Sequence, residues 1–178
     1  MVTVGKSVKN FELPATGDKN LSLKDFKGRT LVLYFYPKDN TPGCTREGQD
    51  FRDAYDEFQA AGAEIVGVSR DSVRTHENFC AKQNFPFDLI SDADETLCTH
   101  ENFCAKQNFP FDLISDADET LCKQFDVIRE KNMYGRKVMG VERSTFLIDG
   151  AGVLRAEWRK VRVPGHVDEV LEAVRGLD

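Results

Sequence analysis

The sequence lacks any apolar run that approaches the roughly 20 residues a membrane-spanning helix needs. Its first 12 residues lack the charged start and long apolar core of a secretory signal. It also lacks a concentration of basic residues: the net charge is −6 with both signs interspersed, so nucleic acid and anionic membranes are not expected partners. Five cysteines without the dense spacing of a disulfide scaffold favour a reducing compartment, and we expect a cytoplasmic protein whose cysteines are free or catalytic.

One stretch of the chain occurs twice. Residues 75–98 and residues 99–122 are identical at all 24 positions, inside a sequence that is otherwise unrepeated. Solenoid repeats drift in sequence and need about three copies to bury a core, so this pair is not a solenoid. A recent tandem duplication, an engineered one and an error in the sequence would each account for it. The length fits one domain, residues 1–178, that carries a surplus copy.

With one copy set aside, hydrophobic periodicity predicts an α/β domain. A hairpin-like start is followed by a strand-helix-strand unit, and a strand-strand-helix unit ends the chain. This order is typical of a thioredoxin-like fold, in which a central mixed β-sheet carries helices on both faces. Residues 126–139 form a mixed segment without a clear pattern. Strands are predicted at residues 11–13, 21–23, 30–36, 65–69, 87–91, 143–148 and 153–158, and helices at about 44–61, 72–83, from 93 and at 167–174.

The segment with the clearest chemical meaning is residues 37–45, which read P-K-D-N-T-P-G-C-T. It follows a buried strand and precedes a helical pattern, so Cys44 lies where a strand passes into a helix. Thr41 suits the N-cap position and Pro42 suits the first helical residue, which places Cys44 in the first turn. There the unpaired backbone N–H groups and the helix dipole favour an anion, and at a cysteine that anion is the nucleophilic thiolate.

Two motifs carry a resemblance to a known family. The pattern Pro-x-x-x-Thr-x-x-Cys on a strand-to-helix turn resembles the peroxiredoxins, thiol peroxidases of the thioredoxin-fold superfamily. The fuller string, with Glu47 close behind, resembles their bacterioferritin-comigratory (PrxQ) branch. Residues 140–149, G-V-E-R-S-T-F-L-I-D, resemble the strand that carries the family's arginine. The resemblance extends from residue 4 to the closing helix, apart from the surplus copy.

The resemblance implies a catalytic site around Cys44. It places Arg143 beside the thiolate, where the guanidinium would hold both the sulfur and a peroxide oxygen. Thr41 would hydrogen-bond the peroxide and the sulfur in addition to capping the helix. Pro37 would shield the thiolate from water. Glu47 would hold Arg143 in position, and the alternative is an ordinary first-turn acid that complements the helix dipole.

A second cysteine is expected to resolve the sulfenic acid that peroxide leaves on the first. One pattern of this branch has it five residues after the peroxidatic cysteine, where this chain has Gln49. Another has it in a later helix, which implies Cys80 or, in the second copy, its twin Cys104. The alternative is that both are helix-face cysteines without a role. Cys98 and Cys122 follow Thr-Leu in a short apolar helix, and we interpret both as core packing.

A metal site is an alternative use of the same residues. His76 and Cys80 lie four residues apart on one predicted helix face, and His100 and Cys104 repeat the arrangement. Together they would supply the two histidines and two cysteines of a tetrahedral zinc site. This spacing arises often by chance and reaches four ligands only through the repeat. We therefore expect no metal and no other cofactor.

The predicted function is a thiol-dependent peroxidase that reduces hydrogen peroxide and organic hydroperoxides. An intramolecular disulfide would follow, and thioredoxin or a similar dithiol would reduce it. A thioredoxin-like disulfide oxidoreductase would need Cys-x-x-Cys at the turn, but the chain has T-P-G-C there. A non-catalytic redox sensor or holdase is the alternative. We expect a monomer, with a swapped dimer as the variant that the repeat makes available.

Overall fold

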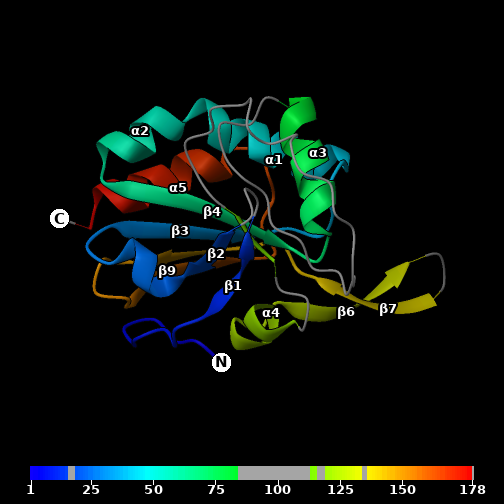
Figure 1. Ribbon diagram of the computed structural model, residues 1–178, viewed down its shortest axis with the longest axis horizontal. Coiled ribbons are helices and arrows are strands. Elements are labelled where there is room, and N and C mark those ends of the chain that lie inside the picture. Colours follow the sequence, from blue (N-terminus) through cyan, green and yellow to red (C-terminus); the bar gives the residue numbers. More distant parts are fainter. Residues whose placement is uncertain (16–18, 84–112, 116–118, 134–135, 178) are drawn as a thin grey trace.

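Short strands and helices follow one another in nearly the order that the sequence predicts (Figure 1). The computed structural model describes residues 1–15, 19–83, 113–115, 119–133 and 136–177. Within these ranges, no helix has the length and apolar character needed to cross a membrane. The elements are β1 (Glu12–Ala15), β2 (Lys19–Ser22), the 3-10 helix η1 (Leu23–Phe26), β3 (Thr30–Phe35), α1 (Pro42–Asp53), α2 (Tyr55–Ala60), β4 (Ala63–Ser69), α3 (Val73–Gln83), β5 (Leu113–Ser115), α4 (Thr120–Gln124), β6 (Ile128–Met133), β7 (Arg136–Val141), β8 (Ser144–Ile148), β9 (Leu154–Arg159) and α5 (His166–Arg175).

Seven of these strands form one mixed sheet in the order β2-β1-β5-β4-β3-β8-β9. Strands β3, β4 and β5 are parallel, whereas β8 runs antiparallel to β3, and β9 runs antiparallel to β8. Figure 1 shows α1, α2 and α5 on one side of this sheet and α4 on the other. A central mixed sheet with helices on both faces confirms the predicted thioredoxin-like fold.

Two neighbouring residues of β3 contact the layers on the two faces of the sheet. Successive side chains of a strand point to opposite faces, so Tyr34 and Phe35 pack in different layers. The Tyr34 ring lies 4.7 Å from the Phe51 ring of α1, and the Phe35 ring lies 5.3 Å from that of Phe125, which follows α4. Phe146 of β8 lies 4.7 Å from Phe125 and completes the second cluster. Buried aromatic packing therefore holds β3 from both sides.

Tyr34 also packs closely on the neighbouring strand, at Gly67. The two residues are partners in the parallel register of β3 and β4, and a Cβ atom built on Gly67 would lie 2.6 Å from the Tyr34 ring. Every residue of β4 is buried, and a side chain at Gly67 would displace the ring. This close approach explains a glycine in the middle of a buried strand.

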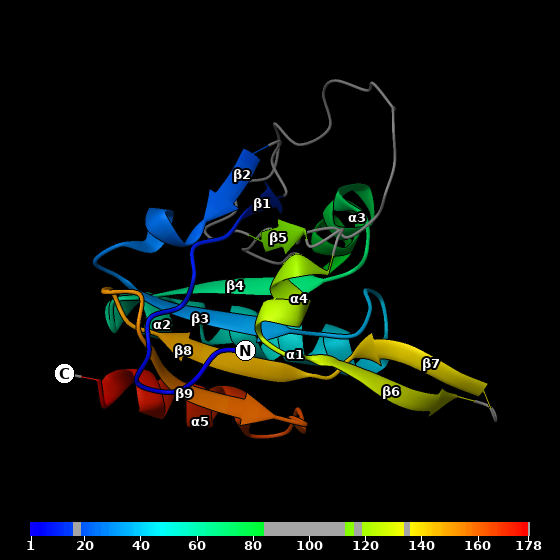
Figure 2. The same ribbon diagram turned by 90° about the horizontal axis from the view of Figure 1, so that it is seen from below.

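Two predicted segments differ from the structure. The helix predicted over about 44–61 is divided, because Ala54 has φ −94° and ψ 1°, so α1 ends before it and α2 begins after it. The mixed segment 126–139 contains most of a hairpin, in which β6 and β7 pair from Ile128 with Val141 to Met133 with Arg136. Figure 2 shows this hairpin projecting from the main body. Its many charged residues obscure the alternation by which a strand is predicted.

The described elements of the repeated region come from both copies. Most of α3 lies in the first copy, whereas β5 and the start of α4 lie in the second. The predicted strand at 87–91 and the predicted helix from 93 fall outside the described residues. Their identical counterparts in the second copy supply β5, which pairs with β4, and the start of α4. One helix, one strand and one short helix thus take the places that a single copy would take.

Candidate active site

Cys44 lies in the first turn of α1, after the loop that leaves β3. Thr41 occupies the N-cap position with extended backbone angles (φ −87°, ψ 146°), and Pro42 is the first helical residue, as predicted. The predicted capping hydrogen bond is wrong, because the Thr41 hydroxyl donates to the carbonyl of Lys38 at 3.0 Å instead. The Thr41 side chain therefore leaves the N–H groups of the first turn to other acceptors.

Arg143 joins Cys44 to Glu47. Its Nη2 donates to Cys44 Sγ at 3.3 Å, and its Nη1 forms a close ion pair with Glu47 Oε2. Cys44 and Glu47 lie three residues apart on α1, and such neighbours share one face of a helix. Arg143 immediately precedes β8, whose first residue, Ser144, pairs with Phe35 at the end of β3. The register of the sheet thus brings a guanidinium from a distant part of the sequence to the cysteine.

Burial controls the charges of this site. Cys44 is 3% exposed and Glu47 is fully buried. Burial raises the pKa of Glu47 to about 7, although the charge and hydrogen bond of Arg143 act to lower it. Burial also acts to lower the pKa of Arg143, but the charges of Glu47 and Cys44 outweigh this effect and raise that pKa. Cys44 therefore faces a permanently charged guanidinium.

A second cation, Lys131 of β6, lies near the same site. Its Nζ donates to the carbonyl of Val141 at 2.6 Å, and its side chain passes beside Gly140, where a Cβ atom would be in ordinary contact at 3.5 Å from Lys131 Cδ. Burial lowers the pKa of Lys131 and the charge of Arg143 lowers it further, whereas Cys44 acts in the opposite direction. Lys131 is not among the site residues predicted from the sequence, because a lysine in a highly charged segment carries no distinguishing signal.

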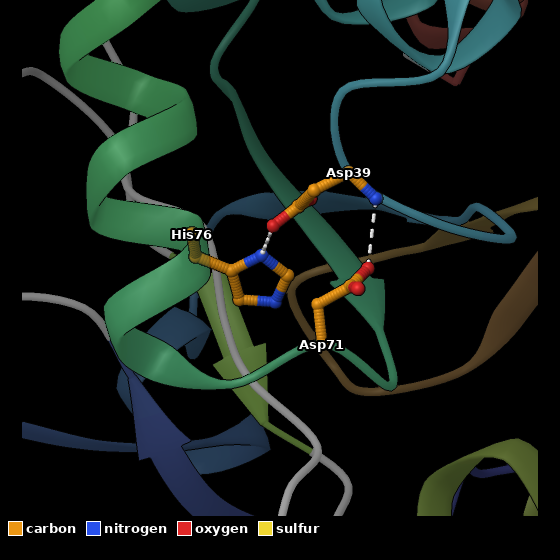
Figure 3. Close-up of side chains that lie close together, drawn as sticks. All are labelled: Asp39, Asp71 and His76. Carbon is orange, nitrogen blue, oxygen red and sulfur yellow. Dashed lines mark hydrogen bonds and ion pairs between the residues drawn. The ribbon is translucent and has the colours of Figure 1, made fainter.

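A buried polar cluster lies between the active-site turn and α3 (Figure 3). Asp39 Oδ2 lies 2.5 Å from His76 Nδ1, and the Tyr36 hydroxyl donates to Asp39 Oδ1 at 2.8 Å. The backbone N–H of Asp39 donates to Asp71 Oδ2 at 2.8 Å, and this oxygen also accepts from Ser69 Oγ. Burial raises the pKa of Asp39 to about 7 and lowers the pKa of His76 to about 3. Between these two pH values the pair holds a single proton.

Among the described residues, the possible metal ligands that gather in one place are Asp39, Asp71 and His76, whose ligand atoms lie within 4.8 Å of one another. They already hydrogen-bond within the cluster, and a cation would have to displace those bonds. The zinc set predicted from the repeat also includes His76. The side chains of the other three ligands are not among those described, so that alternative stays a prediction.

The structure locates the remaining predicted residues as follows. Pro37 is partly buried at the start of the turn. Cys80 lies in α3, although its side chain is not among those described, and Cys98 and Cys104 lie outside the described residues. Cys122 is buried in α4, in agreement with its interpretation as core packing.

Comparison with protein-family profiles matches residues 4–100 and 94–157 to the AhpC/TSA family. The two matches overlap at residues 94–100 and do not establish how the repeat arose. Peroxiredoxin Bcp of Xanthomonas campestris pv. campestris is 49% identical over 167 residues, which cover 93% of this chain and 89% of that protein. Peroxiredoxin Bcp of Bacillus subtilis is 39% identical over 176 residues, which cover 99% of this chain and 97% of that protein.

Solved structures show the same relationship. A cysteine-to-serine mutant of Xylella fastidiosa PrxQ superposes with a TM-score of 0.81 and 40% identity, covering 99% of this chain and 97% of that protein. A structure of Xanthomonas campestris bacterioferritin comigratory protein, which concerns alkyl peroxide reduction, gives a TM-score of 0.75 and 47% identity, covering 93% and 90%. The chain therefore belongs to the AhpC/TSA family and is a Bcp/PrxQ-type peroxiredoxin, a thiol peroxidase.

Proposed function

We propose that Cys44 is the cysteine with which this thiol peroxidase attacks its peroxide. One observation carries the assignment: Arg143 Nη2 donates to Cys44 Sγ at 3.3 Å in the first turn of a helix. A guanidinium and a helix N-terminus both stabilise negative charge, so together they favour the nucleophilic form of the sulfur. Burial of the sulfur supports the same role, because electrostatic stabilisation is stronger where water is excluded.

In the first chemical step, the Cys44 sulfur attacks the terminal oxygen of hydrogen peroxide or an organic hydroperoxide. An S–O bond forms and the O–O bond breaks, so the cysteine is oxidised to a sulfenic acid. The leaving oxygen takes up a proton and departs as water or an alcohol. Negative charge develops on the oxygens, where Arg143 and the N–H groups of the turn act as donors. The Thr41 hydroxyl would exchange its bond to Lys38 for one to the peroxide.

The other site residues have supporting roles in this proposal. Glu47 fixes the orientation of Arg143 by pairing with Nη1, which leaves Nη2 for the sulfur. Pro37 limits access of water to the turn from which the peroxide is attacked. Lys131 adds a second positive charge, so the site attracts the electron-rich oxygens of a peroxide.

The second chemical step is assigned to Cys80 or to its twin Cys104. The thiol sulfur attacks the sulfenic sulfur of Cys44, an S–S bond forms and water leaves. A thioredoxin-type dithiol then supplies two electrons and two protons by thiol–disulfide exchange. We favour Cys80, because α3 follows β4 through the short described connection at residues 70–72.

Two variants test this division of roles. Cys44→Ser should abolish peroxide reduction, because a hydroxyl is not ionised at neutral pH. Replacing both Cys80 and Cys104 by Ser should leave one rapid turnover and block recycling by thioredoxin. If that double variant recycles at the parental rate, neither cysteine resolves. A non-catalytic redox sensor would instead stop after one equivalent of peroxide in the unmodified protein, with thioredoxin and its reductase present.

The disulfide partner can be identified despite the identical copies, because trypsin separates them. Cleavage after lysine and arginine leaves Cys44 in peptide 39–46, Cys80 in peptide 75–82 and Cys104 in peptide 83–106. We expect mass spectrometry of the oxidised protein to detect 39–46 linked to 75–82. Peptide 83–106 also contains Cys98, so fragmentation of the linked peptides locates the bond. A dominant link between 39–46 and 83–106 through Cys104 would show that the second copy resolves the sulfenic acid.

A further inference from the structure

The cluster of Asp39, Asp71 and His76 joins the two segments that the proposed reaction must bring together (Figure 3), and the Tyr36 hydroxyl contacts Asp39 and His76. Strands β3 and β4 are parallel, so the segments that follow them leave from the same edge of the sheet. Asp39 lies in the turn after β3, five residues before Cys44. His76 lies in α3, which follows β4, and it is one helical turn before Cys80. Each of the two cysteines thus follows, within a few residues, one of the two side chains that meet in this cluster.

The contact between Asp39 and His76 is buried on both sides. The His76 side chain is inaccessible to solvent and the Asp39 side chain is 1% exposed, with 2.5 Å between Nδ1 and Oδ2. His76 Nε2 has no hydrogen-bond partner among the described residues, so Nδ1 anchors the ring. The Tyr36 hydroxyl lies 3.3 Å from the same nitrogen, and Asp71 holds the backbone N–H of Asp39. Loss of the ring would leave a buried oxygen of the Asp39 carboxyl group without its partner.

We propose that the contact between Asp39 and His76, here called the clasp, controls the rate of the resolving step, in which the second cysteine attacks the sulfenic acid. While the clasp is closed, it holds α3 against the active-site turn and keeps the Cys44 site assembled for reaction with peroxide. When it opens, α3 unwinds locally and its cysteine reaches the sulfenic acid. This inference rests on the proposed resolving role of Cys80. Both members are positioning residues, since neither contacts the peroxide.

The clasp has a direct kinetic consequence. A disulfide requires the two Cα atoms to lie within about 7 Å, and we expect Cys44 and Cys80, which lie in two separate helices, to reach this distance through local unfolding. The rate of disulfide formation is then proportional to the population of the opened state. A weaker clasp should therefore speed disulfide formation. It should also lower the yield of sulfinic acid, because a second peroxide molecule competes with resolution for the same sulfenic acid.

The test uses the full chain with Cys104→Ser, so that Cys80 is the one proposed resolving cysteine that remains. His76→Leu removes the hydrogen bond and retains an apolar side chain of similar bulk. His76→Asn keeps an amide, which can donate or accept a hydrogen bond near the position of Nδ1, and serves as the conservative variant. Leucine favours helix more than asparagine does. Helix propensity alone would therefore make α3 more stable in His76→Leu than in His76→Asn, whereas we expect α3 to open more readily in His76→Leu. Asn78→Leu, at an exposed position of the same helix, is the matched control.

Three quantities are measured for each variant. The rate constant for hydrogen peroxide comes from competition with a haem peroxidase, the ratio of disulfide to sulfinic acid comes from intact mass spectrometry, and opening of α3 comes from amide hydrogen exchange of residues 75–82. For His76→Leu we expect disulfide formation and exchange to rise about tenfold, as for loss of one buried hydrogen bond. The peroxide rate constant should stay within about twofold. His76→Asn and Asn78→Leu should resemble the parent.

The outcomes separate failure of the clasp from failure of the proposed function. If Cys80→Ser forms disulfide as fast as its parent, Cys80 does not resolve and the clasp has no step to time. If Cys80→Ser blocks the disulfide but His76→Leu leaves its rate unchanged or slower, the clasp is wrong and the resolving role stands. Should His76→Leu fail to fold, Asp71→Ala opens the same clasp by removing the acceptor of the Asp39 N–H, and the same two outcomes apply.

Discussion

Replacing Gly43 by alanine should slow peroxide reduction without weakening the fold. Gly43 is the second residue of α1, and a Cβ atom built on it would lie 3.3 Å from Arg143 Nη2. The same nitrogen donates to Cys44 Sγ at 3.3 Å, while the other end of the guanidinium is held by Glu47. A methyl group must therefore push Nη2 by a few tenths of an ångström away from the position in which it meets the sulfur.

The size of the effect follows from the bond that is disturbed. A hydrogen bond to a charged group contributes about 1.5–3 kcal/mol, so its complete loss would reduce the rate about 10- to 150-fold. A small displacement weakens the bond of Arg143 rather than removing it, and we expect a fall of about tenfold. The free energy of unfolding should rise by up to about 1 kcal/mol, because alanine favours helix over glycine. Activity and stability should thus change in opposite directions.

The assay is the second-order rate constant for hydrogen peroxide at pH 7, measured beside urea unfolding. Gly176→Ala is the matched control: its Cβ atom would lie an ordinary 3.5 Å from the Glu172 carbonyl, far along the chain from the site, and the rate should not change. Arg143→Lys gives the lower limit of the rate constant, because an ammonium cannot contact both the sulfur and the carboxylate as the guanidinium fork does. A parental rate in Gly43→Ala together with a large loss in Arg143→Lys would refute the argument from geometry.

Two further substitutions address stability. The pKa of Glu47 is raised to about 7 from an ordinary 4.5, so the folded state holds a proton that the unfolded chain releases, and this contribution is lost as pH rises. Relative to Glu47→Gln, the parent should lose up to about 1.4 kcal/mol of unfolding free energy for each pH unit between about pH 4.5 and 7. Urea unfolding at several pH values measures this slope. A parent that instead gains stability as pH rises would show that the ion pair with Arg143 outweighs burial. Gly67→Ala should destabilise the fold by about 1–3 kcal/mol, because its Cβ atom would lie 2.6 Å from the Tyr34 ring, while the activity of the folded fraction is retained. Equal stability of Gly67→Ala and the parent would show that the ring moves freely.

The parts of the site that could be predicted are those whose signal is local. The strand, the proline-bearing turn and the helix around Cys44 follow one another within about 20 residues, and each has its own pattern. The Thr41 hydroxyl was predicted less well, because Lys38 offers a competing acceptor within the same turn. Short-range preference places a residue at a helix start but does not decide between two nearby acceptors.

The parts that could not be predicted depend on how distant segments meet. Asp39 and His76 are 37 residues apart, and they meet because two parallel strands end at the same edge of the sheet. In the sequence, His76 is distinguished by its spacing to Cys80, a property of one helix, whereas the side chains that contact it in the structure lie on other elements. Lys131 depends likewise on the pairing of β6 with β7, which the charged segment did not reveal.

The repeat allows a decisive prediction about the fold. Since the two copies are identical, deleting any 24 consecutive residues that start between 75 and 99 yields the same single-copy protein. In it the connection between Gln83 and the strand that now forms β5 shortens from 29 residues to five, with every described contact kept. For an unstructured chain this lowers the entropy cost of closure by about 1.5 kcal/mol. We therefore expect the single-copy protein to unfold at a higher urea concentration and to reduce peroxide at the parental rate. A less stable or slower single-copy protein would mean that the surplus residues contribute contacts of their own to the folded domain.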